Sequence, residues 1–360
     1  MRTTCLAGLA MLAVACADNP GSPRMDTAQA FGHGSGITVM TRNVYVGANV
    51  DIVIGAEDPS QIPVLVAQAY QELWATNFPL RAELLADEIA TTRPHVVGLQ
   101  EISHIRIQDP GDLVIGGTTP ATTTVFDFLD LLMDALEARG LDYDVVATVE
   151  NTDVELPMVT SATPTFADVR LTDYDVLLAR GDVSTANAVG VNFATEMPVP
   201  GTPIVVTRGF VAADATVGGR TYRVVNTHLE SAHPLVRLGQ AAELVQYLAG
   251  ETRPIIAVGD FNSDAVTGEQ TYQFLLSQGY ADAWQSRDGG PTQALTCCQA
   301  SDLSNTTSIL DERLDLVLSR NLPAAAVFAD VIGDDPSERV GGLWPSDHAG
   351  VVARFPMPPR

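Results

Sequence analysis

Ile255–Ser263, with the sequence IIAVGDFNS, combines an apolar strand with a polar end. Four apolar residues come first, which is typical of a strand buried on both faces. Asp260 and Asn262 follow, two positions apart. Because residues i and i+2 of an extended strand lie on one face, these two side chains point in the same direction. The stretch therefore predicts a core strand that delivers an acid and an amide to one site.

Other strands of the chain end on polar residues in the same way. Asn226 and His228, in VVNTHL, repeat the spacing of two. An isolated Asp after a strand is usually a turn residue, but so many strand-terminal polar residues in one chain are not explained by turns. The remaining positions are Asn43 after TVMTR, Glu101 after VVGLQ, Asp315 in RLDLV, and Asp347 with His348 in SDH.

The rest of the chain alternates between helix and strand patterns. Apolar residues recur at helical spacing in 61–76, 80–91, 125–138 and 235–248, and short strands such as 95–101 and 143–149 separate these segments. No segment after the N-terminus approaches the roughly 20 apolar residues of a membrane span. No internal repeat or change of composition follows residue 36. The pattern predicts one α/β domain with mostly antiparallel strands over residues 37–358.

The chain is strongly acidic. Its net charge is −24, and all 20 of its basic residues are Arg. The absence of Lys excludes P-loop, Schiff-base and Ser-Lys chemistry. An acidic surface repels nucleic acid at long range, since phosphate contacts normally come from a basic patch. A polyanionic substrate would therefore need bound cations or a few directed Arg side chains.

The N-terminus has the pattern of an export signal. Residues 1–16, MRTTCLAGLAMLAVAC, place one Arg before an apolar core and small residues before Cys16. These small residues also resemble a bacterial lipoprotein processing site, which would make Cys16 a lipidated first residue. Residues 17–36 are polar and rich in Gly and Pro, as in a flexible tether. We expect a protein that is secreted, periplasmic or on the outer surface, either free or lipid-anchored.

Two further cysteines, Cys297 and Cys298, are adjacent in sequence. In an oxidising compartment they can form a disulfide, for which we expect a structural role in a loop. A metal site is disfavoured because no His or further Cys lies nearby in the sequence.

The ordered set LQE, NTHLE, VGDFN, RLDLVL and SDH, after T-x-N, resembles the endonuclease/exonuclease/phosphatase superfamily, also called DNase I-like. The resemblance covers roughly residues 37–356. It implies a four-layered α/β/β/α sandwich of two mostly antiparallel sheets flanked by helices, with the site where the sheet ends meet. It also implies hydrolysis of phosphodiesters or phosphomonoesters with Mg²⁺ or Mn²⁺, with Ca²⁺ as a further option.

The same resemblance implies how metal and water are held. Glu101 would be the principal metal ligand, helped by Asn43 and Asp347. Asp260 would position or deprotonate the attacking water, and Asn262 would donate to a phosphate oxygen. The residue chemistry agrees, because Mg²⁺ takes oxygen ligands and keeps several waters, so a few carboxylates suffice.

The resemblance also implies roles for the two motif histidines. Asp315 would orient and charge His348, which contacts the phosphate, since a neighbouring carboxylate fixes the tautomer and stabilises the cation. His228 would donate a proton to the leaving oxygen. Asn226 is a further predicted phosphate contact.

One phosphate contact is not fixed by any motif. The superfamily places a polar or aromatic residue on a middle strand, and Arg170, Asp173 and Tyr174 all lie in the corresponding segment here. Of the three, we favour Arg170.

We therefore expect a monomeric, metal-dependent hydrolase of phosphoric esters, with phosphodiesters as the favoured substrates. The substrate could be a nucleic acid, a phospholipid or a small phosphoester. An extracellular nuclease, a sphingomyelinase-like or phospholipase-C-like enzyme, and a non-catalytic binding module are the alternatives. The acidic surface weakens the first, the lack of a long exposed aromatic hairpin weakens the second, and the intact set of acids and histidines argues against the third.

Overall fold

The computed structural model describes residues 36–161, 165–200, 202, 204–287, 293–322 and 325–357. The predicted export signal, the predicted tether up to residue 35, and therefore Cys5 and Cys16, lie outside these residues. Within the described part, none of the helices has the length and apolar character that a membrane crossing requires.

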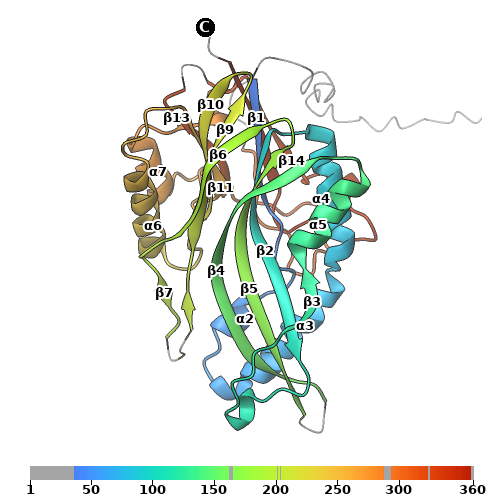
Figure 1. Cartoon of the computed structure of the whole chain (residues 1–360). Helices are drawn as coiled ribbons and strands as arrows, with labels where there is room; N and C mark the ends of the chain where they lie inside the picture. The colour runs from blue at the N-terminus through green and yellow to red at the C-terminus, as the bar shows by residue number, and fades with distance from the viewer. Residues whose placement is uncertain are drawn as a thin grey trace, which may run out of the picture.

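A seven-stranded sheet forms one half of the described domain (Figure 1). Its order is β14-β15-β1-β2-β5-β4, with β3 paired to β2. β1 and β2 run parallel, whereas the other neighbours are antiparallel. The strands are β1 (Gly36–Asn43), β2 (Val96–Gln108), β3 (Thr123–Asp127), β4 (Tyr143–Val159), β5 (Phe166–Arg180), β14 (Phe328–Ile332) and β15 (Gly350–Pro356).

A six-stranded sheet forms the other half, in the order β12-β13-β11-β10-β9-β6. Only the pair β10–β11 is parallel among its neighbours in the described residues. Its strands are β6 (Ser184–Asn192), β9 (Gly209–Val217), β10 (Arg220–His228), β11 (Ile255–Asp260), β12 (Ala281–Asp282) and β13 (Asp315–Arg320), and a separate hairpin consists of β7 (Met197–Pro198) and β8 (Val205–Val206).

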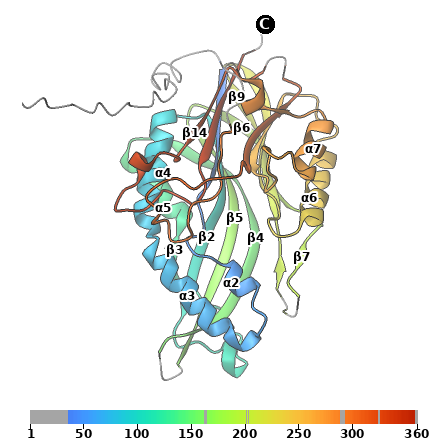
Figure 2. The same cartoon turned by 180° about the vertical axis from the view of Figure 1, so that it is seen from behind.

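Helices cover the outer faces of the two sheets (Figures 1 and 2). α4 and α5 pack on the first sheet through a core that includes Phe78 and Phe128, and α6 and α7 pack on the second through Leu244 and Leu275. This confirms the α/β/β/α sandwich. The helices of the described residues are α2 (Asp51–Ile54), α3 (Ile62–Ala75), α4 (Phe78–Thr92), α5 (Phe128–Ala138), α6 (Pro234–Tyr247), α7 (Gln270–Ser277) and α8 (Ala283–Ser286), with 3-10 turns η1 (Pro59–Gln61), η2 (Leu113–Ile115) and η3 (Pro336–Glu338).

Strand β11 shows why its sequence is a continuous apolar run. Ile256 and Val258 lie in the core between the sheets, whereas Ile255 and Ala257 lie in the core beneath α6 and α7. Both faces are therefore buried, as the sequence predicted. Asp260 continues the side of Ile256 and Val258, so its carboxylate emerges where the inter-sheet core ends.

Strand β2 contains an irregularity that turns one acid into the site. Val97 and Leu99 pack in the helix-covered core, so strict alternation would also send Glu101 to that face. The pairing with β5 shifts register between Leu99 and Ile102, and Glu101 has a left-handed φ of 59°. Such bulges redirect side chains, and a left-handed φ is uncommon for a residue other than Gly. The irregularity brings Glu101 to the inter-sheet side.

β2, β4 and β5 continue beyond the sandwich (Figure 1). The sequence predicted strands over 95–101 and 143–149, but β2 runs to Gln108 and β4 to Val159. α2 and α3 pack against this extension, and Figure 2 shows α3 lying across it. The apolar residues of this extension therefore lie beyond the ends of the sandwich strands.

Candidate active site

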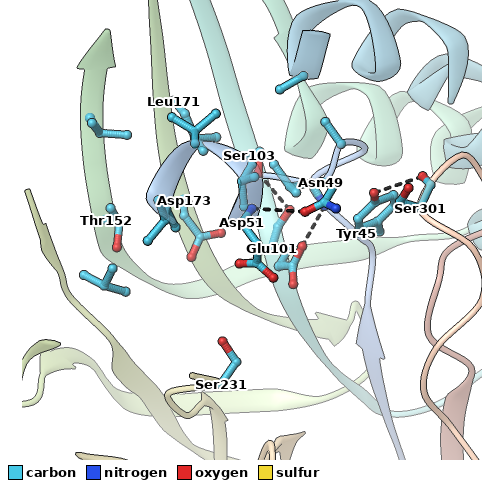
Figure 3. A pocket seen from close by; sticks show the side chains of 18 of the residues that line it. Tyr45, Asn49, Asp51, Glu101, Ser103, Thr152, Leu171, Asp173, Ser231 and Ser301 are labelled. Atoms are coloured by element: carbon cyan, nitrogen blue, oxygen red, sulfur yellow. Dashed lines mark hydrogen bonds between the residues drawn. The ribbon is translucent and has the colours of Figure 1, made fainter. Parts of the chain in front are cut away.

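The polar strand ends meet at one cavity of about 490 Å³. Both sheets contribute: Glu101 comes from the first, and His228 and Asp260 come from the second. Figure 3 shows Glu101 beside Ser103 of β2 and Asp173 of β5. The sequence-predicted residues that line the cavity are Glu101, His228, Asp260, Asn262, Asp347 and His348.

Asn43, at the end of β1, connects two of these carboxylates. Its Nδ2 donates to Oε1 of Glu101 at 2.9 Å and to Oδ2 of Asp260 at 3.2 Å. Its Oδ1 accepts the backbone N–H of Tyr45 at 2.9 Å, which fixes the orientation of the amide. Oε2 of Glu101 accepts the backbone N–H of Val46 at 2.7 Å. Asn43 therefore holds an acid of each sheet in a fixed relation to the other.

His348 lies in the loop before β15 and is held by Asp315 at the start of β13. Its Nδ1 is 2.8 Å from Oδ2 of Asp315, and its Nε2 is 3.7 Å from Oδ2 of Asp260. Burial disfavours the imidazolium, but the carboxylates of Asp315, Asp260 and Asp347 outweigh it and raise the pKa of His348 well above its ordinary value. The contact with Asp315 holds the ring in one orientation and favours its cationic form.

His228, at the end of β10, has the opposite environment. Its Nε2 is 3.5 Å from Oδ2 of Asp260, and its Nδ1 is 2.9 Å from Nη1 of Arg208. A guanidinium can only donate, so Nδ1 accepts and the ring proton is on Nε2. Burial, together with the positive charges of Arg208 and His348, lowers the pKa of His228 well below its ordinary value. His228 is therefore a neutral donor that faces Asp260.

Asp260 and Asn262 form a tight turn after β11. Oδ1 of Asp260 accepts the backbone N–H of Asn262 at 2.9 Å, and Asn262 has a φ of 48°, which Asn tolerates better than most residues. The Asn262 side chain donates to the carbonyl of Leu229 at 2.9 Å. Burial raises the pKa of Asp260, while the charge of His348 opposes that shift. The carboxylate is thus fixed through Oδ1, while its Oδ2 accepts from Asn43 and faces the two histidines.

The donor set fits a hard divalent cation. Burial and the charge of Glu101 raise the pKa of Asp347 to about 7, against the opposing effect of His348. Two carboxylates that converge on one cavity are relieved by a cation, and Mg²⁺ and Mn²⁺ favour oxygen ligands. Asp260, Asp315 and His348 also place ligand atoms within 4.8 Å of one another, but there the imidazole is already bound to Asp315. Glu101 and Asp347 are therefore the pair that could hold such a cation.

A comparison with protein-family models matches residues 43–348 to the endonuclease/exonuclease/phosphatase family. The chain belongs to this family. The match runs from Asn43 to His348 and so contains every residue of the site described above. A comparison with curated protein sequences gives no significant match.

Solved structures share the fold at low sequence identity. A mannosyl-6-phosphatase from Bacteroides thetaiotaomicron is 17% identical with a TM-score of 0.53, over 88% of this chain and 98% of that one. An endonuclease/exonuclease/phosphatase family protein from Leptotrichia buccalis is 15% identical with a TM-score of 0.51, over 88% and 98%. Truncated TDP2 from Caenorhabditis elegans is 15% identical with a TM-score of 0.51, over 89% and 97%. At this identity the likeness shows the fold.

Asn226 is not placed to contact a phosphate. It is fully buried, and its amide donates to the carbonyls of Leu99 at 2.8 Å and Val176 at 3.0 Å and accepts from Gln100. Asn226 and His228 share a face as predicted, but Asn226 lies two residues deeper, where the sheets pack. Its role is to tie the two sheets together. Gly98 permits the close approach there, since a Cβ at Gly98 would lie 2.6 Å from Oδ1 of Asn226.

Arg170 is also placed away from the site. Its Nε donates to Asp153 at 2.8 Å, and it does not line the cavity. Alternation along β5 explains this, because Leu171 and Asp173 face the cavity and Arg170 faces away. Of the three residues considered for this strand, Asp173 is the one that the structure brings to the site. Burial raises the pKa of Asp173 to about 6, although Arg208 opposes the shift from 3.6 Å.

Two arginines complete the site without belonging to a motif. Arg208 precedes β9 and lines the cavity between Asp173 and His228. Arg81 of α4 is fully buried and donates to the backbone carbonyls of Val44 and Tyr45, which fixes the loop that binds Glu101. Arg208 belongs to none of the motifs, and nothing in the sequence indicated that it would meet His228. Arg81 gave no signal beyond its place in a helix.

A disulfide joins Cys297 and Cys298. The sequence suggested a loop staple remote from histidines, and the fold changes that picture. Both cysteines line the cavity, and Sγ of Cys298 is 3.8 Å from Nε2 of His348. The pair therefore forms part of the cavity wall beside His348.

Proposed function

We propose that this protein is a divalent-metal-dependent hydrolase of phosphoric esters, with phosphodiesters as its main substrates. Membership of the endonuclease/exonuclease/phosphatase family supports hydrolysis of phosphoric esters in general. The observation that carries the proposal is the position of Asp260. Its Oδ2 lies within 3.7 Å of Nε2 of both histidines, and Asn43 links it to Glu101.

Glu101 and Asp347 would hold the metal, and Asn43 would keep Glu101 in place next to Asp260 through its two hydrogen bonds. A bound Mg²⁺ or Mn²⁺ would supply positive charge to the phosphate and help to activate the attacking water. Such a local positive charge would also offset the repulsion between the acidic protein surface and the anionic substrate.

The protein's own groups then act on the attacking water and on the phosphate. Asp260 orients the water and takes its proton, which its raised pKa favours. His348, as a cation held by Asp315, contacts the phosphate and supplies a proton to the leaving oxygen. His228 acts as a neutral hydrogen-bond donor through Nε2–H, which faces Asp260. This replaces the earlier expectation that His228 is the proton donor, because Arg208 already donates to its Nδ1.

A substrate panel tests the proposal. Purified protein is assayed with Mg²⁺, with Mn²⁺ and with EDTA on plasmid DNA, RNA, sphingomyelin, inositol phosphates and a chromogenic phosphodiester. We expect hydrolysis that EDTA abolishes and that Glu101→Ala and His348→Ala reduce by a factor of at least about 10³. Glu137→Ala, which removes an exposed carboxylate from α5, is the matched control and should retain full activity. Activity that persists in EDTA, or in Glu101→Ala, would exclude the mechanism.

Export and anchoring are a separate part of the proposal, supported by residues 1–16 of the sequence alone. We expect a lipidated Cys16 and a monomer. Labelled palmitate should enter the wild type and not Cys16→Ser, and equal labelling of the two would rule out the lipoprotein. Sedimentation of the soluble form should give the mass of one chain.

A further inference from the structure

The catalytic cavity continues into an apolar part along the extension of β2, β4 and β5. The pairing of β5 with β2 and β4 shows the order in which residues line this part. Ser103 pairs with Asp173 next to the catalytic residues, and Ile105 pairs with Leu171 one step further out. Val154 pairs with Leu171 on the other side, and the next pair outward is Leu156 with Val169. The same wall therefore changes from polar to apolar with distance from Glu101. Figure 3 shows Leu171, Asp173 and Ser103 along this wall.

Two other elements close the sides of the apolar part. α2 and α3 contribute Val53, Val66 and Tyr70, and the β7–β8 segment contributes Met197 and Val206. The apolar part is thus a channel between a sheet, a helix pair and a hairpin. Ile105 is four positions after Glu101, which corresponds to roughly 13 Å along a strand. The channel extends well past the space that a phosphate group needs.

The charges of the cavity disfavour a nucleic-acid strand in this channel. Among the described residues that line the cavity, the basic ones are Arg208 and the two histidines, and Arg208 is engaged with Asp173 and His228. Acidic side chains are more numerous, and they include Asp51 and Glu230. A nucleic-acid backbone needs repeated cationic contacts, whereas an apolar chain needs none. A cavity of about 490 Å³ is also in the range that holds one small ligand.

We propose that the substrate is a phosphoester that carries a single long alkyl or acyl chain, such as a lysophospholipid, and that this chain lies in the channel beside Leu171. This inference rests on the proposed phosphoester hydrolysis and names the substrate class of the same site. The phosphate lies among Glu101, Asp260 and His348, and the chain follows β2 and β5 outward. Binding then depends on chain length, because each buried methylene adds apolar contact.

The test measures binding, so that it does not depend on turnover. Methyl, butyl, octyl and dodecyl phosphate, each below its micelle-forming concentration, are titrated by calorimetry into the wild-type protein with Mg²⁺. We expect Kd to fall about two- to fourfold per added methylene, so that octyl phosphate binds at least about a hundredfold more tightly than methyl phosphate. A Kd that is independent of chain length would overturn the inference.

Two variants on opposite walls locate the chain. Leu171→Gln and Met197→Gln place an amide in the channel, and Met197→Gln changes side-chain volume little. Each should reduce the ratio of the methyl to the octyl Kd at least about tenfold. Leu276→Gln is the matched control, because Leu276 is half-buried in α7 and does not line the cavity. If Leu171→Gln and Met197→Gln keep the wild-type ratio, as the control Leu276→Gln should, the chain does not lie in the channel.

Turnover distinguishes this inference from the proposed function. If every phosphoester in the panel is inert but dodecyl phosphate binds and Leu171→Gln weakens it, hydrolysis is wrong and the channel stands. If methyl p-nitrophenyl phosphate is hydrolysed while Kd ignores chain length, hydrolysis stands and the chain assignment is wrong. A mononucleotide that binds more tightly than dodecyl phosphate would also overturn the chain assignment, in favour of a nuclease.

Discussion

His348 and His228 direct the same atom toward Asp260 but differ in what holds the far side of the ring. A carboxylate lies 2.8 Å from Nδ1 of His348, and a guanidinium lies 2.9 Å from Nδ1 of His228. The first partner stabilises an imidazolium and the second prevents one. The two histidines of one buried cavity therefore differ in protonation state. In each case the residue that contacts Nδ1 determines that state. The sequence motifs NTHLE and SDH do not contain that information.

The largest expected effect separates the two histidines directly. Glutamine can place an amide N–H near the position of Nε2 but cannot carry a positive charge. His348→Gln should lower kcat/KM for a chromogenic phosphodiester by about 10³ or more, because it removes a cation and a proton donor. His228→Gln should cost only about tenfold, because a neutral donor is kept. Equal losses in the two variants would show that the rings do the same work.

The next effect tests the carboxylate that holds His348. Asp315→Asn keeps the shape of the side chain and removes its charge. We expect kcat/KM to fall about 10²-fold, in line with the loss of a group that orients and charges a catalytic ring. Thermal unfolding of the variant serves as the control for structural damage. A folded Asp315→Asn protein with wild-type kcat/KM would mean that His348 does not need its partner.

A smaller effect tests the guanidinium that holds His228. Arg208→Gln and His228→Gln should each cost about tenfold in kcat/KM, and the double variant should cost little more than either one. The effects of substituting two residues that act through a shared contact do not add, and a double-mutant cycle measures the difference. Losses that multiply to about a hundredfold would show that Arg208 acts on the substrate independently of His228.

The smallest effect uses a third histidine as a reference outside the site. Nδ1 of His95 accepts the backbone N–H of Thr38 at 3.0 Å. Burial, with the charge of Arg180, lowers the pKa of His95 from 6.5 to about 4. The neutral ring is favoured in the folded state, so its contribution to stability is complete above pH 6.5 and is lost as the pH falls toward 4.

The variant His95→Asn removes this titration. Between pH 7 and pH 5 the wild type should lose about 1 kcal/mol more of its free energy of unfolding than His95→Asn does, a value reduced for the partial exposure of the ring. Urea unfolding at the two pH values measures the difference. If the two proteins lose the same amount, the depressed pKa of His95 is wrong, and the environments assigned to His228 and His348 need the same direct check.

The sequence predicted the strand ends well because local pattern controls them. A buried apolar run followed by a polar residue fixes both the strand and its end, so Asp260 and His228 were found before the fold was known. Family resemblance then placed Glu101 in the site. Alternation alone would have sent it to the helix side, since the bulge that redirects it depends on pairing with β5.

The rest of the site depends on contacts that no local pattern records. The i, i+2 rule gives the face of Asn226 but not its depth in the sandwich, and it cannot choose between Arg170 and Asp173 without the register of β5. The apolar channel was missed because the sequence-based strands stopped near Glu101 and Val149, whereas β2 and β4 continue to Gln108 and Val159. Arg208 meets His228 only after two strands pair.

The bridge made by Asn43 limits how this protein could be altered. The Asn43 amide donates hydrogen bonds to one acid from each sheet, so neither sheet contains a complete site by itself. Surface loops could be exchanged or lengthened with little risk, whereas a slip of one strand relative to its neighbour would separate the two acids. The outer channel lies away from this contact, so its residues could be changed while the two acids stay in place.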